Sequence, residues 1–188
     1  LLTLDGLDLC TNLTKLSINA WQVSLGDIDL SAFTKLTDVT MSPTAGYTSI
    51  QLPDGIKSFK SIIKYANHEP VGPTTLDLTQ YTDLEYVSVM DSYGEPAALK
   101  SLNVSGLSKL ALLYVGGTPE VNIANCPLLT TCIKNNGTYE SGFYWSGSSS
   151  SQTIIVESEA KRDQLKTSWK EVMGYDEENP ANAWTIQQ

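Results

Sequence analysis

A compound hydrophobic pattern in residues 102–115, LNVSGLSKLALLYV, is repeated along most of the chain. Its apolar positions are separated by 2, 3, 3, 3 and 2 residues, which fits neither the helical period of 3.6 nor strand alternation throughout. The two ends, each LxV, predict short extended pieces, and the central LxxLxxL predicts a tight turn or 3₁₀ segment between them. One such unit cannot bury its own apolar stripe, so it requires copies stacked on either side.

Copies of this pattern precede and follow the template. The segments 28–41 and 76–89 have the same spacing, and 121–132 follows it until Lys134 breaks the last position. The segment 50–63 fits with one residue added after Pro53, and a first unit at 2–18 has a longer middle. About six repeats at intervals of roughly 19 to 26 residues match the length expected of leucine-rich repeats.

Three phrases resemble a particular group of leucine-rich repeat proteins, the BspA-like surface proteins of anaerobic bacteria. SAFTKLTDVTMSP (31–43) is similar to that family's AFxxCxxLxxIxIP, LPDGIKSF (52–59) to its IPxxVxxI, and IANCPLL (123–129) to its SxCxxL. The resemblance implies an α/β fold: a right-handed leucine-rich repeat solenoid with a parallel concave sheet, an irregular convex side of short strands or 3₁₀ turns, and a C-terminal helical cap. It also implies a bacterial, extracellular or cell-surface location, for example on an outer-membrane lipoprotein.

In each repeat, the LxL that follows the LxxL should form a strand of the concave sheet. We expect these strands around Ser17, Thr40, Ile63, Ser88, Tyr114 and Ile133. In the third unit either Ile62 with Lys64 or Ile63 with Tyr65 could point inward, and we favour the second pair because it keeps a lysine out of the core.

The residues that flank each inward pair should point outward, because side chains in a strand alternate between faces. Tyr86, Met90, Leu112 and Tyr114 are then expected to form one exposed apolar and aromatic patch, with Ser88 as its polar partner. Such patches usually mark interaction sites. The alternative is that the segment around Trp145 folds over this surface and completes the core.

Residues 136–152, rich in Gly and Ser, are predicted to form a loop that nevertheless contains several aromatic residues, among them Tyr144 and Trp145. Two interpretations remain open. The aromatic side chains could cover the open end of the solenoid, because terminal repeats must be capped. They could instead form a stacking platform for a sugar ring or a peptide, which adds Tyr144 and Trp145 to the candidate binding surface.

The last segment, 153–188, is expected to be a strand–helix cap. Residues 153–156 predict a strand and 158–173 an amphipathic helix. One face of this helix carries Leu165, Trp169, Val172 and Met173, and Gly174 supplies the stop. We therefore expect one domain over 1–188, with repeats at 1–135, the loop at 136–152 and the cap at 153–188.

The composition of the chain limits the classes of partner that it could bind. A formal net charge of −9, with scattered Lys and Arg, argues against a nucleic-acid partner or an anionic membrane surface. No apolar run is long enough to cross a bilayer, so direct membrane insertion is not expected. The start at Leu1, without Met or a leader, suggests a mature or engineered fragment.

The three cysteines, Cys10, Cys126 and Cys132, stand at apolar repeat positions and predict buried free thiols. A zinc site is not expected, since the single histidine, His68, lies far from any cysteine pair.

Catalytic chemistry is not specified by any motif. A Ser-His-Asp scheme would have to use His68, which lies in the turn NHEPVGP, and acids such as Asp91 and Glu95 lie in turns where they serve the backbone. We therefore predict a protein without catalysis or cofactor, a surface recognition module that binds a protein or glycan. The alternative is a structural spacer or assembly domain of a larger surface lipoprotein.

Overall fold

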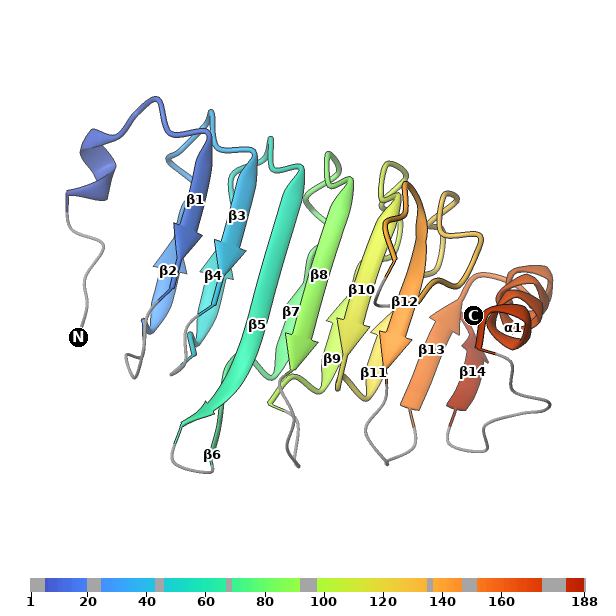
Figure 1. The fold of residues 1–188 in the computed structure, drawn as a ribbon. Helices are drawn as coiled ribbons and strands as arrows, with labels where there is room; N and C mark the ends of the chain where they lie inside the picture. The colour runs from blue at the N-terminus through green and yellow to red at the C-terminus, as the bar shows by residue number, and fades with distance from the viewer. Residues whose placement is uncertain are drawn as a thin grey trace.

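The computed structural model is a parallel β-solenoid of about five turns with one C-terminal α-helix (Figure 1). It describes residues 6–19, 25–42, 46–66, 69–91, 98–134, 137–146, 152–173 and 182–187. A 3₁₀ turn, η1 (Leu7–Leu9), precedes the first strand. The predicted stacking of repeats is confirmed, and strands make up most of the described elements.

The larger sheet contains six strands from successive repeats, and these strands are parallel to one another. In spatial order they are β1 (Lys15–Ile18), β3 (Asp38–Met41), β5 (Ser58–Ala66), β8 (Tyr86–Asp91), β10 (Leu112–Gly116) and β12 (Gly142–Ser146). A short strand, β6 (Glu69–Val71), pairs antiparallel with the end of β5. Val87 and Leu113 lie in register with Phe59 and Phe143 on neighbouring strands, and all four are fully buried.

The opposite side of the solenoid is also built from strands. They are β2 (Asp27–Asp29) and β4 (Ser49–Gln51), which pair with each other, and β7 (Thr75–Asp77), β9 (Ser101–Asn103), β11 (Glu120–Asn122), β13 (Gln152–Val156) and β14 (Asn182–Ile186). The short strands expected on this side are confirmed, but they pair into parallel sheets, so this side is more regular than we expected.

A break separates β4 from β7 on this second side. In other turns the N–H of the residue after the strand donates to the next turn, as from Leu30 to Gln51 O (2.8 Å). In the third turn, the N–H of Leu52 donates instead to the hydroxyl of Tyr81 (3.0 Å). The tyrosine hydroxyl thus satisfies a buried backbone donor that would otherwise lose its partner.

The turns between the two sides repeat the same hydrogen bonds. The N–H of Leu110 donates to Leu107 O (3.2 Å), and the equivalent bonds close at Leu36, Leu84 and Leu129. These four leucines are fully buried, as the repeat spacing predicts. Asp or Asn begins most of these turns by accepting the N–H two residues later, as Asp77 does from Thr79 (3.0 Å).

The third turn has a register that we did not predict. β5 is aligned through Phe59 with Val87 and through Ser61 with Val89, so the inward pair equivalent to the other turns is Phe59 and Ser61. Ile63 is buried as expected, but it lies one step further along a longer strand, and the side chain of Tyr65 is outside the described residues. Ser61 is tolerated in the core because its hydroxyl hydrogen-bonds that of Tyr47 (2.8 Å).

The segment expected to be a loop at 136–152 contains a strand of the larger sheet, β12, so that expectation is wrong for residues 142–146. β12 pairs with β10 on one side, and on the other side Phe143 forms a parallel bridge with Cys132. The strand expected around Ile133 is therefore reduced to this bridge, and β12 occupies the place beside β10.

Gly142 permits this insertion. It has φ +141°, and a Cβ there would lie 2.4 Å from Cγ2 of Ile133. We expect Gly142→Ala to lower the free energy of unfolding by about 2 kcal/mol or more, through backbone strain and overpacking. Urea unfolding followed by circular dichroism measures the change.

Gly55→Ala is the matched control, since a Cβ at Gly55 meets nothing within 4 Å. Equal stability of the two variants would contradict the tight contact between β12 and the segment at 131–133.

The C-terminal cap forms as predicted. Helix α1 (Glu159–Met173) follows β13, and the hydroxyl of Ser158 accepts the N–H of Lys161 (3.2 Å) at its start. Leu165 is fully buried against the core, and Trp169 packs against Trp145 with ring centroids 6.0 Å apart. Gly174, the expected stop, and the side chain of Met173 are outside the described residues.

The cysteines divide into two kinds. Cys126 and Cys132 are buried free thiols, as predicted, and burial raises the pKa of Cys126 to about 11 and of Cys132 to about 12. Cys10 is exposed, contrary to the expectation, because it follows η1 at the surface of the first turn.

Candidate functional site

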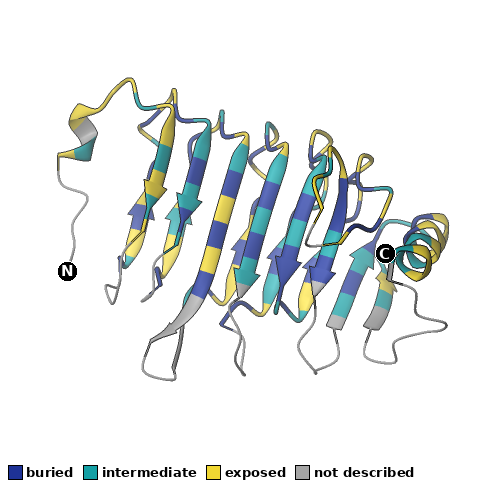
Figure 2. Ribbon diagram, in the orientation of Figure 1, coloured by how far each residue is buried: buried dark blue, intermediate teal, exposed yellow. Residues whose placement is uncertain are grey.

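The outward face of the larger sheet is the surface on which the candidate residues meet. Figure 2 shows the alternation of buried and more exposed positions along its strands. Tyr86, Ser88 and Met90 of β8 and Leu112 and Tyr114 of β10 alternate with fully buried valines and leucines, and each is half-buried. The prediction that these five side chains point outward from the larger sheet is therefore confirmed.

Three tyrosines from consecutive strands, Tyr86, Tyr114 and Tyr144, form what we call the tyrosine row. The ring centroids of Tyr86 and Tyr114 are 5.9 Å apart with the planes tilted by 35°, and those of Tyr114 and Tyr144 are 5.9 Å apart with a tilt of 40°. Tyr114 lies in register with Tyr144 on β12 and with Ser88 on β8. Tyr86 lies two residues before Ser88 on the same strand. The row brings three amphipathic rings together across the sheet.

Trp145 does not belong to this surface. It is 1% exposed and faces the core in register with Val115, where it packs against Trp169 of α1. The two adjacent aromatic residues Tyr144 and Trp145 point to opposite faces because they follow each other in a strand. Each of the two interpretations of this segment therefore applies to one residue. Trp145 completes the core, and Tyr144 extends the outward surface.

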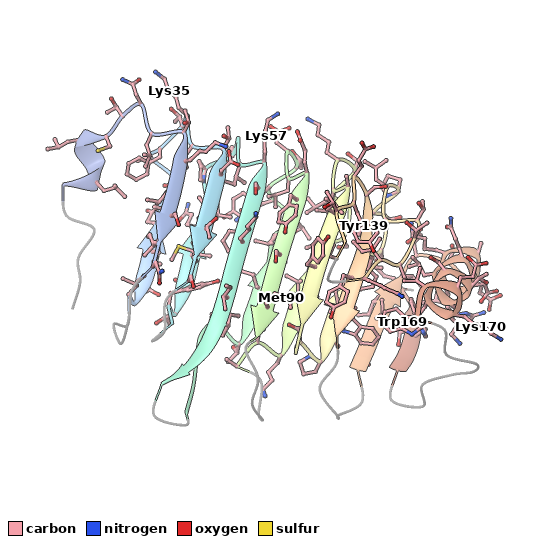
Figure 3. The ribbon with its side chains drawn as sticks, viewed as in Figure 1. Lys35, Lys57, Met90, Tyr139, Trp169 and Lys170 are labelled. Atoms are coloured by element: carbon pink, nitrogen blue, oxygen red, sulfur yellow. The ribbon has the colours of Figure 1, made fainter. Side chains whose placement is uncertain are left out.

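The structure adds two residues of β5 that our sequence analysis did not assign to the site. The ammonium of Lys60 lies over the ring of Tyr86, 4.8 Å from its centroid, which is the geometry of a cation–π interaction. Ile62 is 36% exposed and in register with Met90, labelled in Figure 3 on β8. Lys60 was missed because we expected the strand of the third turn further along, around Ile63. Ile62 is outward in the pair that we favoured but was not included in the predicted patch, although the alternation in FKSII is a signal for a strand.

Charged groups around this face are mostly neutralised in pairs. Lys57 donates to Glu85 (3.1 Å) and Lys109 to Asp83 in the turns before the strands, and Lys15 pairs with Asp38 (3.6 Å) on the first two strands. In the part of the chain that the structure describes, Lys60 forms no ion pair with a carboxylate. No Asp or Glu occupies a described outward position of β5, β8, β10 or β12.

The hydroxyl of Tyr114 remains protonated over the neutral range. Partial burial raises its pKa, with smaller contributions from Tyr86 and from Tyr139, which precedes β12 (Figure 3). The hydroxyl can therefore both donate and accept a hydrogen bond.

Catalytic and metal-binding arrangements are not found among the described residues. No group of three or more His, Cys, Asp or Glu side chains in them could hold a metal ion. His68, Glu95 and the side chain of Asp91 are outside the described residues. Within the same part of the chain, none of the helices has the length and apolar character required to cross a membrane.

Comparisons with protein-family models, with curated proteins and with solved structures found no match to this chain.

Proposed function

We propose that this protein is a leucine-rich repeat module of the right-handed BspA-like type that binds a protein or glycan through the face carrying the tyrosine row, without catalysis. The observation that carries the proposal is the row itself: three half-buried tyrosines from non-adjacent parts of the sequence meet on one sheet face. Tyrosine is among the residues that concentrate binding energy at interfaces. The repeat spacing supports the leucine-rich repeat type, and the family resemblance supports an extracellular or cell-surface location.

The test is a screen of the whole domain on glycan and protein arrays, followed by the double variant Tyr86→Ala, Tyr114→Ala. We expect binding of the selected ligand to weaken by about 2 kcal/mol or more, because truncating interface tyrosines removes both ring contact and a hydroxyl. Titration calorimetry measures the loss, and a thermal melt monitors folding. If the double variant loses stability but binds the ligand unchanged, the tyrosine row is packing and the recognition surface lies elsewhere.

A second candidate, a spacer or assembly domain, is favoured by β1. Its inward residues Leu16 and Ile18 are half-buried, whereas Val39 and Met41, their partners on β3, are fully buried. A further unit stacked on β1 would complete the burial of both side chains. A spacer should bind no ligand on the glycan and protein arrays. The unit that stacks on it should cover β1 and leave the tyrosine row free.

A further inference from the structure

The tyrosine row has one cation beside it, because the ammonium of Lys60 lies over the ring of Tyr86. The chain carries a formal net charge of −9, yet the described outward positions of the four strands around the row contain Lys60 and no carboxylate. The carboxylates of Asp83 and Glu85 in the neighbouring turns are held by Lys109 and Lys57. Lys60 is therefore the charge at these described positions that lacks a carboxylate partner, and it can attract a negatively charged group of a ligand at this end of the row.

The side chains around Lys60 suit a ligand rich in hydroxyl groups. Ser58, Ser88 and the three tyrosines each end in a hydroxyl that both donates and accepts. Sugar hydroxyls have the same two-way capacity, and the C–H faces of sugar rings pack against aromatic rings. The row spans β8, β10 and β12, so it can contact several consecutive sugar residues.

We propose that this surface binds an oligosaccharide containing uronic acids, which crosses the strands along the tyrosine row with a carboxylate directed at Lys60. This inference rests on the proposed recognition function and specifies its ligand. No bond is made or broken, because the tyrosine rings supply contact and Lys60 supplies a charge-assisted hydrogen bond to the carboxylate.

A peptide fits the surface less well. Extended peptides are usually held by adding a strand to a free sheet edge, and helical ones by a groove. β8 and β10 are interior strands, each paired with a strand on both sides, so their main-chain groups are already bonded within the sheet. A ligand on this face must be recognised by side chains alone, and these are tyrosine rings, hydroxyls, one ammonium and the apolar side chains of Ile62, Met90 and Leu112.

Titration calorimetry on the whole domain tests the proposal with hexasaccharides from polygalacturonate, alginate and hyaluronan. Maltohexaose and cellohexaose serve as neutral probes, and hexa-aspartate serves as an anionic peptide. We expect binding of at least one uronate hexasaccharide, weakened by added salt, and no comparable binding of the neutral or peptide probes. Lys60→Gln should weaken uronate binding about tenfold, and Lys60→Arg should retain most of it.

Two substitutions away from the row are matched controls. Lys100→Gln removes an exposed lysine from β9's side of the solenoid, and Leu128→Ala removes exposed apolar area from a turn. Both should bind the uronate chain as the parent does, whereas Tyr114→Ala should weaken binding at least as much as Lys60→Gln. Circular dichroism melts confirm that each variant is folded.

Other outcomes overturn the inference in distinguishable ways. Equal binding of neutral hexasaccharides, unaffected by Lys60→Gln, leaves the recognition function in place but removes the acidic specificity. Equal binding of hexa-aspartate shows a general anion site. If no saccharide binds but a protein ligand depends on Tyr86 and Tyr114, the ligand is a protein. If no ligand depends on the row, the proposed function fails together with this inference.

Discussion

Leu110→Ala should lower the free energy of unfolding by about 2–5 kcal/mol, as measured for other fully buried leucines. Leu110 is 0% exposed and lies in an internal turn, between the turns of Leu84 and Leu129, which are equally buried. Shortening its side chain leaves a cavity that the rigid turn cannot close, because the backbone of Leu110 is fixed by its bond to Leu107 O. Urea unfolding monitored by circular dichroism measures the loss.

Leu128→Ala is the control for this experiment, because Leu128 occupies a similar turn but is 45% exposed. The same chemical change there should alter stability by less than about 1 kcal/mol. Similar unfolding midpoints for Leu110→Ala and the parent protein would show that the buried leucines do not support one another across the turns.

The periodic part of the fold could be predicted from sequence because it depends on local spacing. In residues 102–115, the six apolar positions that define the repeat pattern are fully buried, and the strands and turn fall where the pattern places them. Alternation within the strands then assigned Tyr86 and Tyr114 to the outward face. A pattern repeated from turn to turn needs no knowledge of distant contacts, since each turn touches only its neighbours.

The errors occurred where a distant residue changes the meaning of a local pattern. Ser61 is polar and does not look like a core position, and only the hydroxyl of Tyr47, 14 residues earlier, makes it one. That register also hid Lys60, which is why the charge beside the row could not be predicted.

β12 was obscured by its Gly- and Ser-rich flanks, although Phe143 and Trp145 have the two-residue spacing of a buried strand. Its position between β10 and the segment at 131–133 is a non-local arrangement that spacing cannot specify. The assignment of Tyr144 to the outward surface and of Trp145 to the core depends on this strand.

Removing residues 153–188 should convert the protein into an aggregating or partly unfolded chain. The cap contributes β13, which pairs with β11, and α1, whose Leu165 is fully buried. It also satisfies backbone groups of the last turn: Ser168 accepts the N–H of Cys132 (2.8 Å), and Lys161 donates to Cys126 O (3.1 Å). Without the cap, these polar groups lose their partners and the apolar end of the solenoid is bared.

Size-exclusion chromatography with light scattering compares the chain ending at Gln152 with the full protein. We expect oligomers or aggregates for the shortened chain, together with binding of a dye that reports exposed apolar surface. In a Trp21→Phe background, Trp145 is the remaining tryptophan of the shortened chain, and its emission should shift to the red as the contact with Trp169 is lost.

A point variant distinguishes the effect of losing the helix contact from the effect of removing a long segment of the chain. Leu165→Ala keeps the whole chain but weakens the seat of α1, so it should lower stability by about 2–5 kcal/mol while the protein stays monomeric. A monomeric chain ending at Gln152, with the stability of the parent and unshifted Trp145 emission, would mean that the helix is a separate appendage. The burial of Trp145 against Trp169 argues that the shortened chain will aggregate or partly unfold. The last strand of the larger sheet completes its core with a side chain from the cap, and the truncation removes that side chain.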